Sequence, residues 1–233
     1  MKYDVILFDL DDTLFDFGMT ERNAFYQLFL EYGLPNGLQD YLGSYKTISK
    51  VLWDELEKGT TTLELLKIER FKRLFLEHNL KLDLEAVSHK YIENLGREIH
   101  LISGVEEMLA SLAGCRLAIL TNGFQIAQHA RIKGSPLKDV FEAIITSEEA
   151  GYQKPQPSIF EYTFKKLGIT EKSKVLMVGD SLTSDIQGGS QFGIDTCWFN
   201  PNQKENTTAI LPTYEIKNWS QLNGIVKGQL LEK

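Results

Sequence analysis

The stretch VILFDLDDT, residues 5–13, decides the fold of this chain. Its first four residues, 5–8, are an unbroken apolar run. A run this short and continuous is typical of a strand that is buried on both faces, as in parallel sheets. Asp9, Asp11 and Asp12 follow at once. The stretch therefore predicts a buried strand whose carboxyl end presents acidic side chains.

Four more short apolar runs occur later in the chain, and each precedes a polar residue. They are residues 117–120, 143–145, 175–178 and 196–199. Helical patterns lie between them, and the one over residues 159–167 ends at Gly168, a residue type that often stops helices. Strands that alternate with helices predict a doubly wound, Rossmann-like α/β core with a parallel sheet and right-handed crossovers.

The segment between the first two predicted strands breaks this alternation. From residue 17 to residue 98 the patterning is helical, and an insertion of this length is far longer than a usual connection. Two apolar stripes are predicted, Ala24, Phe25, Leu28, Phe29 and Tyr32 in one helix and Leu65, Ile68, Phe71 and Phe75 in another. We therefore expect a core domain of residues 1–16 and 99–233, and a helical cap domain of residues 17–98.

Composition excludes several classes of protein. The 233 residues include 25 basic and 32 acidic side chains, a net charge of −7, which disfavours a nucleic-acid polymer as partner. No apolar run exceeds four residues, whereas a membrane span needs about 20. The two cysteines, Cys115 and Cys197, form no disulfide framework. We expect a cytoplasmic protein that binds neither a membrane nor a nucleic-acid polymer.

Polar side chains follow the predicted strands, and the carboxyl ends of parallel strands are where such sheets bind ligands. They are Asp9, Asp11, Thr121, Asn122, Lys154, Asp180 and Asp185. Crowded carboxylates repel one another, and Mg²⁺ relieves this repulsion while binding substrate phosphate oxygens. The four histidines are scattered without the spacing of zinc ligands. Carboxylates beside a lysine and a threonine hydroxyl predict phosphoryl transfer with Mg²⁺ as cofactor.

Four motifs in this order resemble those of the haloacid dehalogenase superfamily. They are Asp9-x-Asp11-x-Thr13, Thr121-Asn122-Gly123, Lys154-Pro155, and Gly179-Asp180-x4-Asp185. The insertion after the first motif resembles the C1 cap of that superfamily. Residues 121–124, 151–155, 179–186 and 195–201 are most similar to bacterial pyrimidine 5′-nucleotidases. The resemblance implies a small phosphorylated metabolite, a nucleotide above all, as the substrate.

The resemblance also implies the catalytic and metal-binding roles of three aspartates. Asp9 would be the nucleophile that forms an aspartyl phosphate. Asp11 would protonate the leaving group and then deprotonate the hydrolytic water. Mg²⁺ would be held by Asp9, by the backbone carbonyl of Asp11 and by Asp180.

Phosphate-binding roles fall on the remaining motif residues. The Thr121 hydroxyl and the Asn122 backbone amide would bind phosphoryl oxygens, and Lys154 would neutralise charge on the nucleophile and the phosphate. Asp185 would orient the site without contacting substrate, through Lys154 or a metal-bound water.

Several alternatives stay open at this point. The cap selects the leaving group, so a phosphoglycolate-type or sugar-phosphate phosphatase is one of them. A 2-haloacid dehalogenase would leave Asp11 and Asp180 without a task, and a phospho-aspartate receiver would have no cap. Aromatic cap residues either stack on a base or fill the interior of the cap. They are Phe17, Tyr41, Tyr45 and Trp53.

Overall fold

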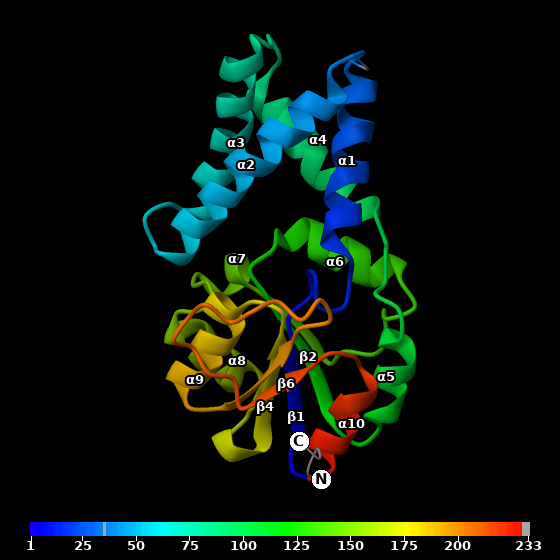
Figure 1. Ribbon diagram of the computed structural model, residues 1–233, viewed down its shortest axis with the longest axis vertical. Helices are drawn as coiled ribbons and strands as arrows, with labels where there is room; N and C mark the ends of the chain where they lie inside the picture. Colours follow the sequence, from blue (N-terminus) through cyan, green and yellow to red (C-terminus); the bar gives the residue numbers. More distant parts are fainter. Residues whose placement is uncertain (35, 230–233) are drawn as a thin grey trace.

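A six-stranded parallel sheet forms the centre of the computed structural model, which describes residues 1–34 and 36–229 (Figure 1). The strand order is β3-β2-β1-β4-β5-β6, and every neighbouring pair is parallel. The strands are β1 Val5–Phe8, β2 Arg116–Thr121, β3 Ala143–Thr146, β4 Val175–Gly179, β5 Asp195–Phe199 and β6 Tyr214–Ile216. The predicted fold class and its five strands are confirmed.

The edge strand β6 is the one that the sequence did not reveal. It has three residues, and its central Glu215 is exposed, so it contains no apolar run that a reader of the sequence would notice. It pairs with β5 on one side only. A polar residue is tolerated there because one face of such a short edge strand meets solvent.

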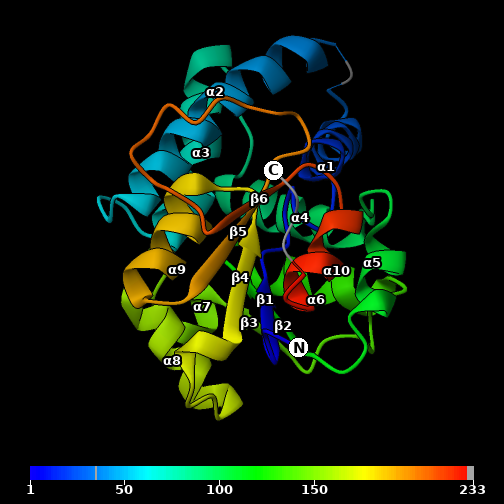
Figure 2. The same cartoon turned by 60° about the horizontal axis from the view of Figure 1, so that its bottom comes forward.

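Helices cover both faces of the sheet (Figure 2). On β1, Ile6 and Phe8 pack in one apolar cluster with residues of α5 and α10, whereas Val5 and Leu7 pack in another with residues of α8 and α9. Burial on both faces explains the unbroken apolar run, because alternate residues of a strand point to opposite sides. The helices of the core are α5 Val105–Ser111, α6 Gln125–Gly134, α7 Ser147–Ala150, α8 Pro157–Leu167, α9 Gln187–Phe192 and α10 Ser220–Val226, with short helical turns η1 Lys172–Lys174 and η2 Leu182–Ile186.

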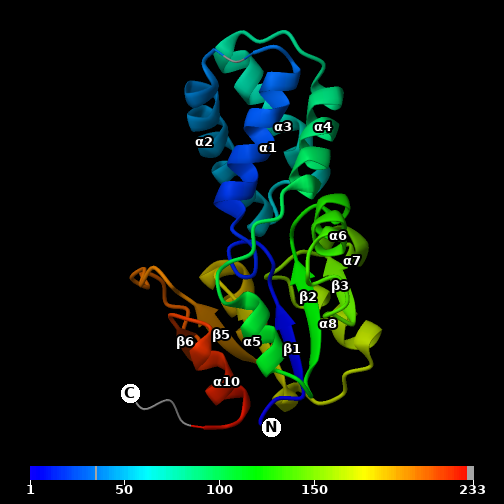
Figure 3. The same cartoon turned by 90° about the vertical axis from the view of Figure 1, so that its right-hand side faces the viewer.

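Four helices stand over the carboxyl end of the sheet (Figures 1 and 3). We call residues 17–98 the cap and the remaining residues the core. The cap helices have an apolar cluster largely of their own, which joins the core through Phe124 and Ala127. The four helices are α1 Phe17–Glu31, α2 Leu38–Glu57, α3 Leu63–His78 and α4 Leu84–Arg97. These bounds support the predicted division into two domains, which stays a prediction.

The apolar stripe predicted for α1 is buried apart from half-buried Tyr32, whereas the one predicted for α3 is partly wrong. Leu65 is 61% exposed, and the buried face of α3 instead includes Leu63, Leu66 and Leu74. Arg70 lies in this true stripe and is only 1% exposed. A buried arginine interrupts the apolar pattern, so the sequence favours the wrong phase of the helix.

Two chain segments connect the core with the cap and run side by side (Figure 3). Phe15 in the first forms an antiparallel bridge with Leu101 in the second. The Asp16 amide donates a hydrogen bond to the carbonyl of His100 at 2.8 Å. The cap is therefore attached through a short paired hinge. Within the part of the chain that is described, none of the helices has the length and apolar character that crossing a membrane requires.

Candidate active site

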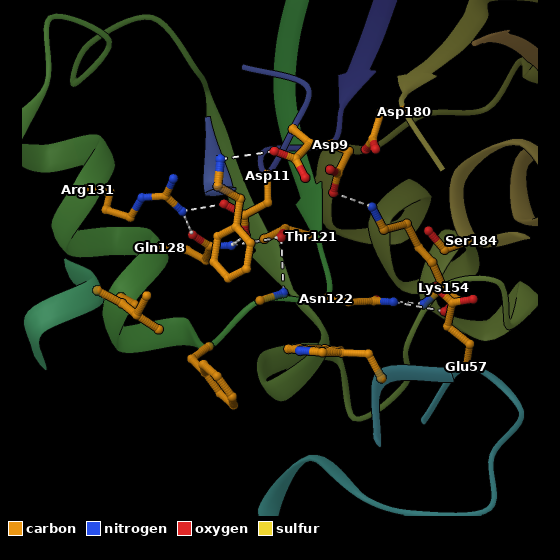
Figure 4. Close-up of a pocket in the computed structure, with 17 residues that line it drawn as sticks. Asp9, Asp11, Glu57, Thr121, Asn122, Gln128, Arg131, Lys154, Asp180 and Ser184 are labelled. Atoms are coloured by element: carbon orange, nitrogen blue, oxygen red, sulfur yellow. Dashed lines mark hydrogen bonds and ion pairs between the residues drawn. The ribbon is translucent and has the colours of Figure 1, made fainter. Parts of the chain in front are cut away.

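Lys154 and Asp9 form the centre of the site (Figure 4). Asp9 follows β1, and its amide donates to the carbonyl of Val178 at 2.9 Å, which continues the pairing of β1 with β4. Lys154 Nζ donates to Asp9 Oδ1 at 2.6 Å, to Asp185 Oδ1 at 2.7 Å and to the carbonyl of Leu120 at 2.6 Å. The lysine side chain is 1% exposed, so three oxygens replace the water it loses.

Asp180 and Asp185 come from the segment directly after β4. The carbonyl of Asp180 accepts a hydrogen bond from Trp198 Nε1 at 2.8 Å, while Asp185 Oδ2 accepts one from the Ser181 amide at 3.0 Å. A side chain at Gly179 would place its Cβ only 2.1 Å from Asp185 Oδ2. Glycine is therefore required there for the carboxylate to turn back toward the site.

Three carboxylates crowd at this point. Oxygens of Asp9, Asp180 and Asp185 all lie within 4.8 Å of one another. Burial raises the pKa of Asp9 to about 7, although Lys154 opposes the shift, and burial also raises the pKa of Asp180 well above its usual value. Because these carboxylate oxygens lie close together and are partly shielded from water, they favour the binding of a divalent cation. The donor set fits Mg²⁺, which prefers carboxylate oxygens.

Asp11 is held by two side chains that the sequence reading missed. Gln128 Nε2 donates to Asp11 Oδ2 at 2.7 Å, and Arg131 Nη1 forms an ion pair with Asp11 Oδ1. Arg131 Nη1 also donates to Gln128 Oε1 at 2.9 Å. Both residues lie on α6, three positions apart and therefore on one face, and both are buried. The carboxyl group of Asp11 thus has a defined position in the same cavity as Asp9.

Thr121 is the last residue of β2, and its hydroxyl oxygen accepts two hydrogen bonds. Its Oγ1 accepts from the Gly123 amide and from Gln128 Nε2, each at 3.1 Å. A hydroxyl has one proton and two acceptor positions, so both acceptor positions are occupied and the proton stays available. The geometry therefore favours donation from Thr121 to a ligand oxygen in the cavity.

The side chain of Asn122 has a structural task of its own. Its Oδ1 accepts from the Lys154 amide at 2.8 Å, and its Nδ2 donates to the Lys154 carbonyl at 2.9 Å. This pair of bonds fixes the loop that carries Lys154. The sequence assigned only the backbone amide of Asn122 to the site, and that assignment stays a prediction.

A cavity of about 270 Å³ lies between the cap and these residues. Phe17, Trp53, Glu57 and Leu95 line it from the cap. A volume slightly below the usual range of roughly 300–1,000 Å³ suits a small ligand. Of the aromatic residues singled out in the cap, Phe17 and Trp53 thus line the cavity. Tyr45 is buried in the cap interior and Tyr41 packs on Phe29.

Polar side chains join the cap to the core beside the cavity. Lys67 of α3 forms an ion pair with Glu148 of α7, which also accepts a hydrogen bond from the Gln125 amide. Gln153 Nε2 donates to the carbonyl of Leu56 at 2.9 Å. Glu148 therefore connects two domains rather than lining the cavity.

Comparison with known proteins identifies the family. Residues 3–193 match the haloacid dehalogenase-like hydrolases. The chain belongs to this family. The resemblance of the four motifs is thereby confirmed, and the protein is an enzyme of the hydrolase class.

This hydrolase has close relatives among named proteins. Pyrimidine 5′-nucleotidase PynA of Streptococcus pneumoniae is 37% identical to it, over 100% of this chain and 99% of PynA. Pyrimidine 5′-nucleotidase YjjG of Escherichia coli is 31% identical, over 97% and 99% of the two chains. The crystal structure of the HAD-hydrolase YfnB from Bacillus subtilis, bound to magnesium, has a TM-score of 0.88 at 37% identity and covers 97% of this chain and 99% of YfnB.

Proposed function

We propose that the enzyme is a Mg²⁺-dependent phosphomonoester hydrolase that acts through an aspartyl phosphate on nucleoside 5′-monophosphates, with a preference for pyrimidines. One observation carries the proposal. The carboxyl groups of Asp9 and Asp11 enter the same cavity two residues apart, with a buried lysine on the first and a Gln–Arg pair on the second. A carboxylate beside a buried ammonium suits a nucleophile, and a second carboxyl group held in a fixed position suits proton transfer.

The proposed reaction has two steps, formation and hydrolysis of the aspartyl phosphate. A carboxylate oxygen of Asp9 attacks phosphorus, the bond from phosphorus to the leaving oxygen breaks, and Asp11 gives that oxygen its proton. A water then attacks the phosphorus of the aspartyl phosphate, Asp11 takes the proton of the water, and the bond to Asp9 breaks. Inorganic phosphate leaves, and both aspartates return to their starting states.

The remaining residues bind and orient. The Thr121 hydroxyl, the Asn122 backbone amide and Lys154 would hold the phosphoryl oxygens. Asp185 positions Lys154, which it contacts at 2.7 Å. Asp9, the backbone carbonyl of Asp11 and Asp180 would bind Mg²⁺, which supplies positive charge against the charge of the phosphate when it is bound.

The relatives favour pyrimidine nucleotides as substrates, and the cavity is compatible with a base. PynA and YjjG, similar over nearly the whole chain, are named pyrimidine 5′-nucleotidases. Trp53 and Phe124 line the cavity, with ring centroids 5.8 Å apart. Aromatic side chains of this kind suit a flat base. A dehalogenase has no use for an acid at Asp11, which here has two dedicated partners.

The experiment is a measurement of phosphate release from a substrate panel, with Mg²⁺ and with excess chelator. The panel contains UMP, dUMP, dTMP, purine nucleotides, phosphoglycolate and hexose phosphates. We expect the highest kcat/KM for pyrimidine nucleotides and loss of activity in chelator. Full activity in chelator contradicts the metal assignment, and equal rates across the panel contradict the nucleotide assignment.

A further inference from the structure

The cationic side chains that line the cavity already contact carboxylates. Two cationic residues are among the described residues that line it, Lys154 and Arg131. Both are 1% exposed, and each already contacts carboxylate oxygens, Lys154 those of Asp9 and Asp185 and Arg131 that of Asp11. A second anionic group on a substrate would therefore find no uncommitted positive charge among these residues.

Glu57 adds a negative charge to the cap wall of the cavity. It is near the end of α2, four residues after Trp53, so the two side chains share one face of the helix. Figure 4 shows Glu57 extending from the cap toward the core residues Lys154 and Ser184. The phosphate end of the cavity is formed by the core, so the cap wall faces the rest of the substrate.

The Glu57 carboxylate is anchored and still has an oxygen for a ligand. Its Oε2 accepts a hydrogen bond from Thr183 Oγ1 of the core at 2.8 Å. Within residues 1–34 and 36–229, no side chain donates a hydrogen bond to its Oε1. A fixed carboxylate with one oxygen available accepts hydrogen bonds from hydroxyl or N–H groups and repels anions.

We propose that Glu57 is a specificity-determining residue that admits monophosphates of uncharged alcohols, nucleosides above all, and rejects substrates with a second anionic group. This inference rests on the phosphatase activity proposed above. It predicts discrimination against phosphoglycolate and against bisphosphates. A charge of the same sign as the second group of a substrate is a strong means of rejecting that substrate.

The test uses two substrates of similar size that differ in the second group, 2-hydroxyethyl phosphate and phosphoglycolate. The first ends in a hydroxymethyl group and the second in a carboxylate. For the wild-type protein with Mg²⁺ we expect kcat/KM to favour 2-hydroxyethyl phosphate by about tenfold or more. A wild-type ratio near one overturns the proposal.

Two variants assign the discrimination to the residue. Glu57→Gln keeps the size and an acceptor oxygen but removes the charge, and it should lower the ratio about tenfold. Glu57→Lys should lower it further by supplying a cation. Asp54→Asn, at an exposed position of the same helix, is the matched control and should keep the wild-type ratio.

The outcomes separate this inference from the proposed function. A ratio that stays within about twofold of wild type in both Glu57 variants overturns the role of Glu57 while phosphatase activity stands. Absence of phosphate release from every monoester in the wild-type protein overturns the proposed function itself. If a Glu57 variant does not fold, which circular dichroism detects, the wild-type ratio and the second variant decide.

Discussion

The core wall and the cap wall of the cavity carry different kinds of side chain. The core wall carries most of the charged groups, among them the ion pairs of Lys154 with Asp9 and of Arg131 with Asp11. The cap wall is mainly apolar, with Glu57 as its carboxylate. Asp9, Thr121 and Asp180 end or follow strands whose register fixes them, whereas the cap groups stand on helices that can change without disturbing the sheet. We therefore expect the core to carry out the reaction and the cap to select the leaving group.

The largest effect should come from Asp9→Asn in the core wall. An amide cannot form the acyl phosphate, so turnover should fall by roughly 10³–10⁶-fold for every substrate. Phosphate release from UMP and from nitrophenyl phosphate measures it. Asp139→Asn, at an exposed residue, is the control and should behave as wild type. Retention of more than a trace of activity would refute the nucleophile assignment.

Asp11→Asn should have the next largest effect, and the effect should depend on the leaving group. A nucleoside alkoxide needs a proton, so its release should slow by roughly 10²–10⁴-fold. Nitrophenolate leaves readily without a proton, so its release should slow far less. Equal losses with the two substrates would show that Asp11 is not the general acid.

Arg131→Met tests whether the partners of Asp11 position it. The uncharged side chain can still fill the space over Phe15, against which the guanidinium packs at 4.6 Å. We expect kcat for UMP to fall by about 10–100-fold, with a smaller loss for nitrophenyl phosphate. Lys133→Met on the same helix, at an exposed position, is the control.

A double variant distinguishes positioning from a general structural role of Arg131. If Arg131 acts through Asp11, its replacement should cost little more in the Asp11→Asn background, because effects within one unit are not additive. Fully additive losses would assign Arg131 a role independent of Asp11.

The smallest effect should come from the cap wall, with Trp53→Leu. Loss of an aromatic surface should lower kcat/KM for UMP by about 5–10-fold, the lower part of the range for stacking on one base. Hydrolysis of 2-hydroxyethyl phosphate should stay within about twofold of wild type. Val51→Ala, exposed on the same helix, is the control. An equal loss of kcat/KM for both substrates would contradict the assignment of leaving-group selection to the cap wall.

Much of the core could be predicted because one sequence pattern indicates both a strand and the functional residue that follows it. A continuous apolar run followed by a polar residue marks both a buried strand and its functional end, as at Phe8 and Asp9 or at Leu120 and Thr121. In a parallel sheet these ends meet whatever the details of the connections. The structure accordingly brings Asp9, Lys154 and Asp185 together.

The missed residues lie where that signal is absent. Gln128 and Arg131 are polar residues on a helix, and such residues usually face solvent, so their burial depends on the packing of α6 against the strand ends. Glu57 enters the site only because the cap docks over the core, a relation between segments that no local pattern records. The buried face of α3 was not predicted because the buried Arg70 interrupts its apolar pattern.

Because oxygens of Asp9, Asp180 and Asp185 lie within 4.8 Å of one another, a cation bound there would couple its binding to folding. Like charges buried together oppose the compact chain, and a ligand that binds only the folded form stabilises it by mass action. At a concentration a hundredfold above its dissociation constant, such a ligand adds about 2.7 kcal/mol to the free energy of unfolding. For the proposed Mg²⁺ site, we therefore expect the temperature of thermal unfolding to rise with the Mg²⁺ concentration.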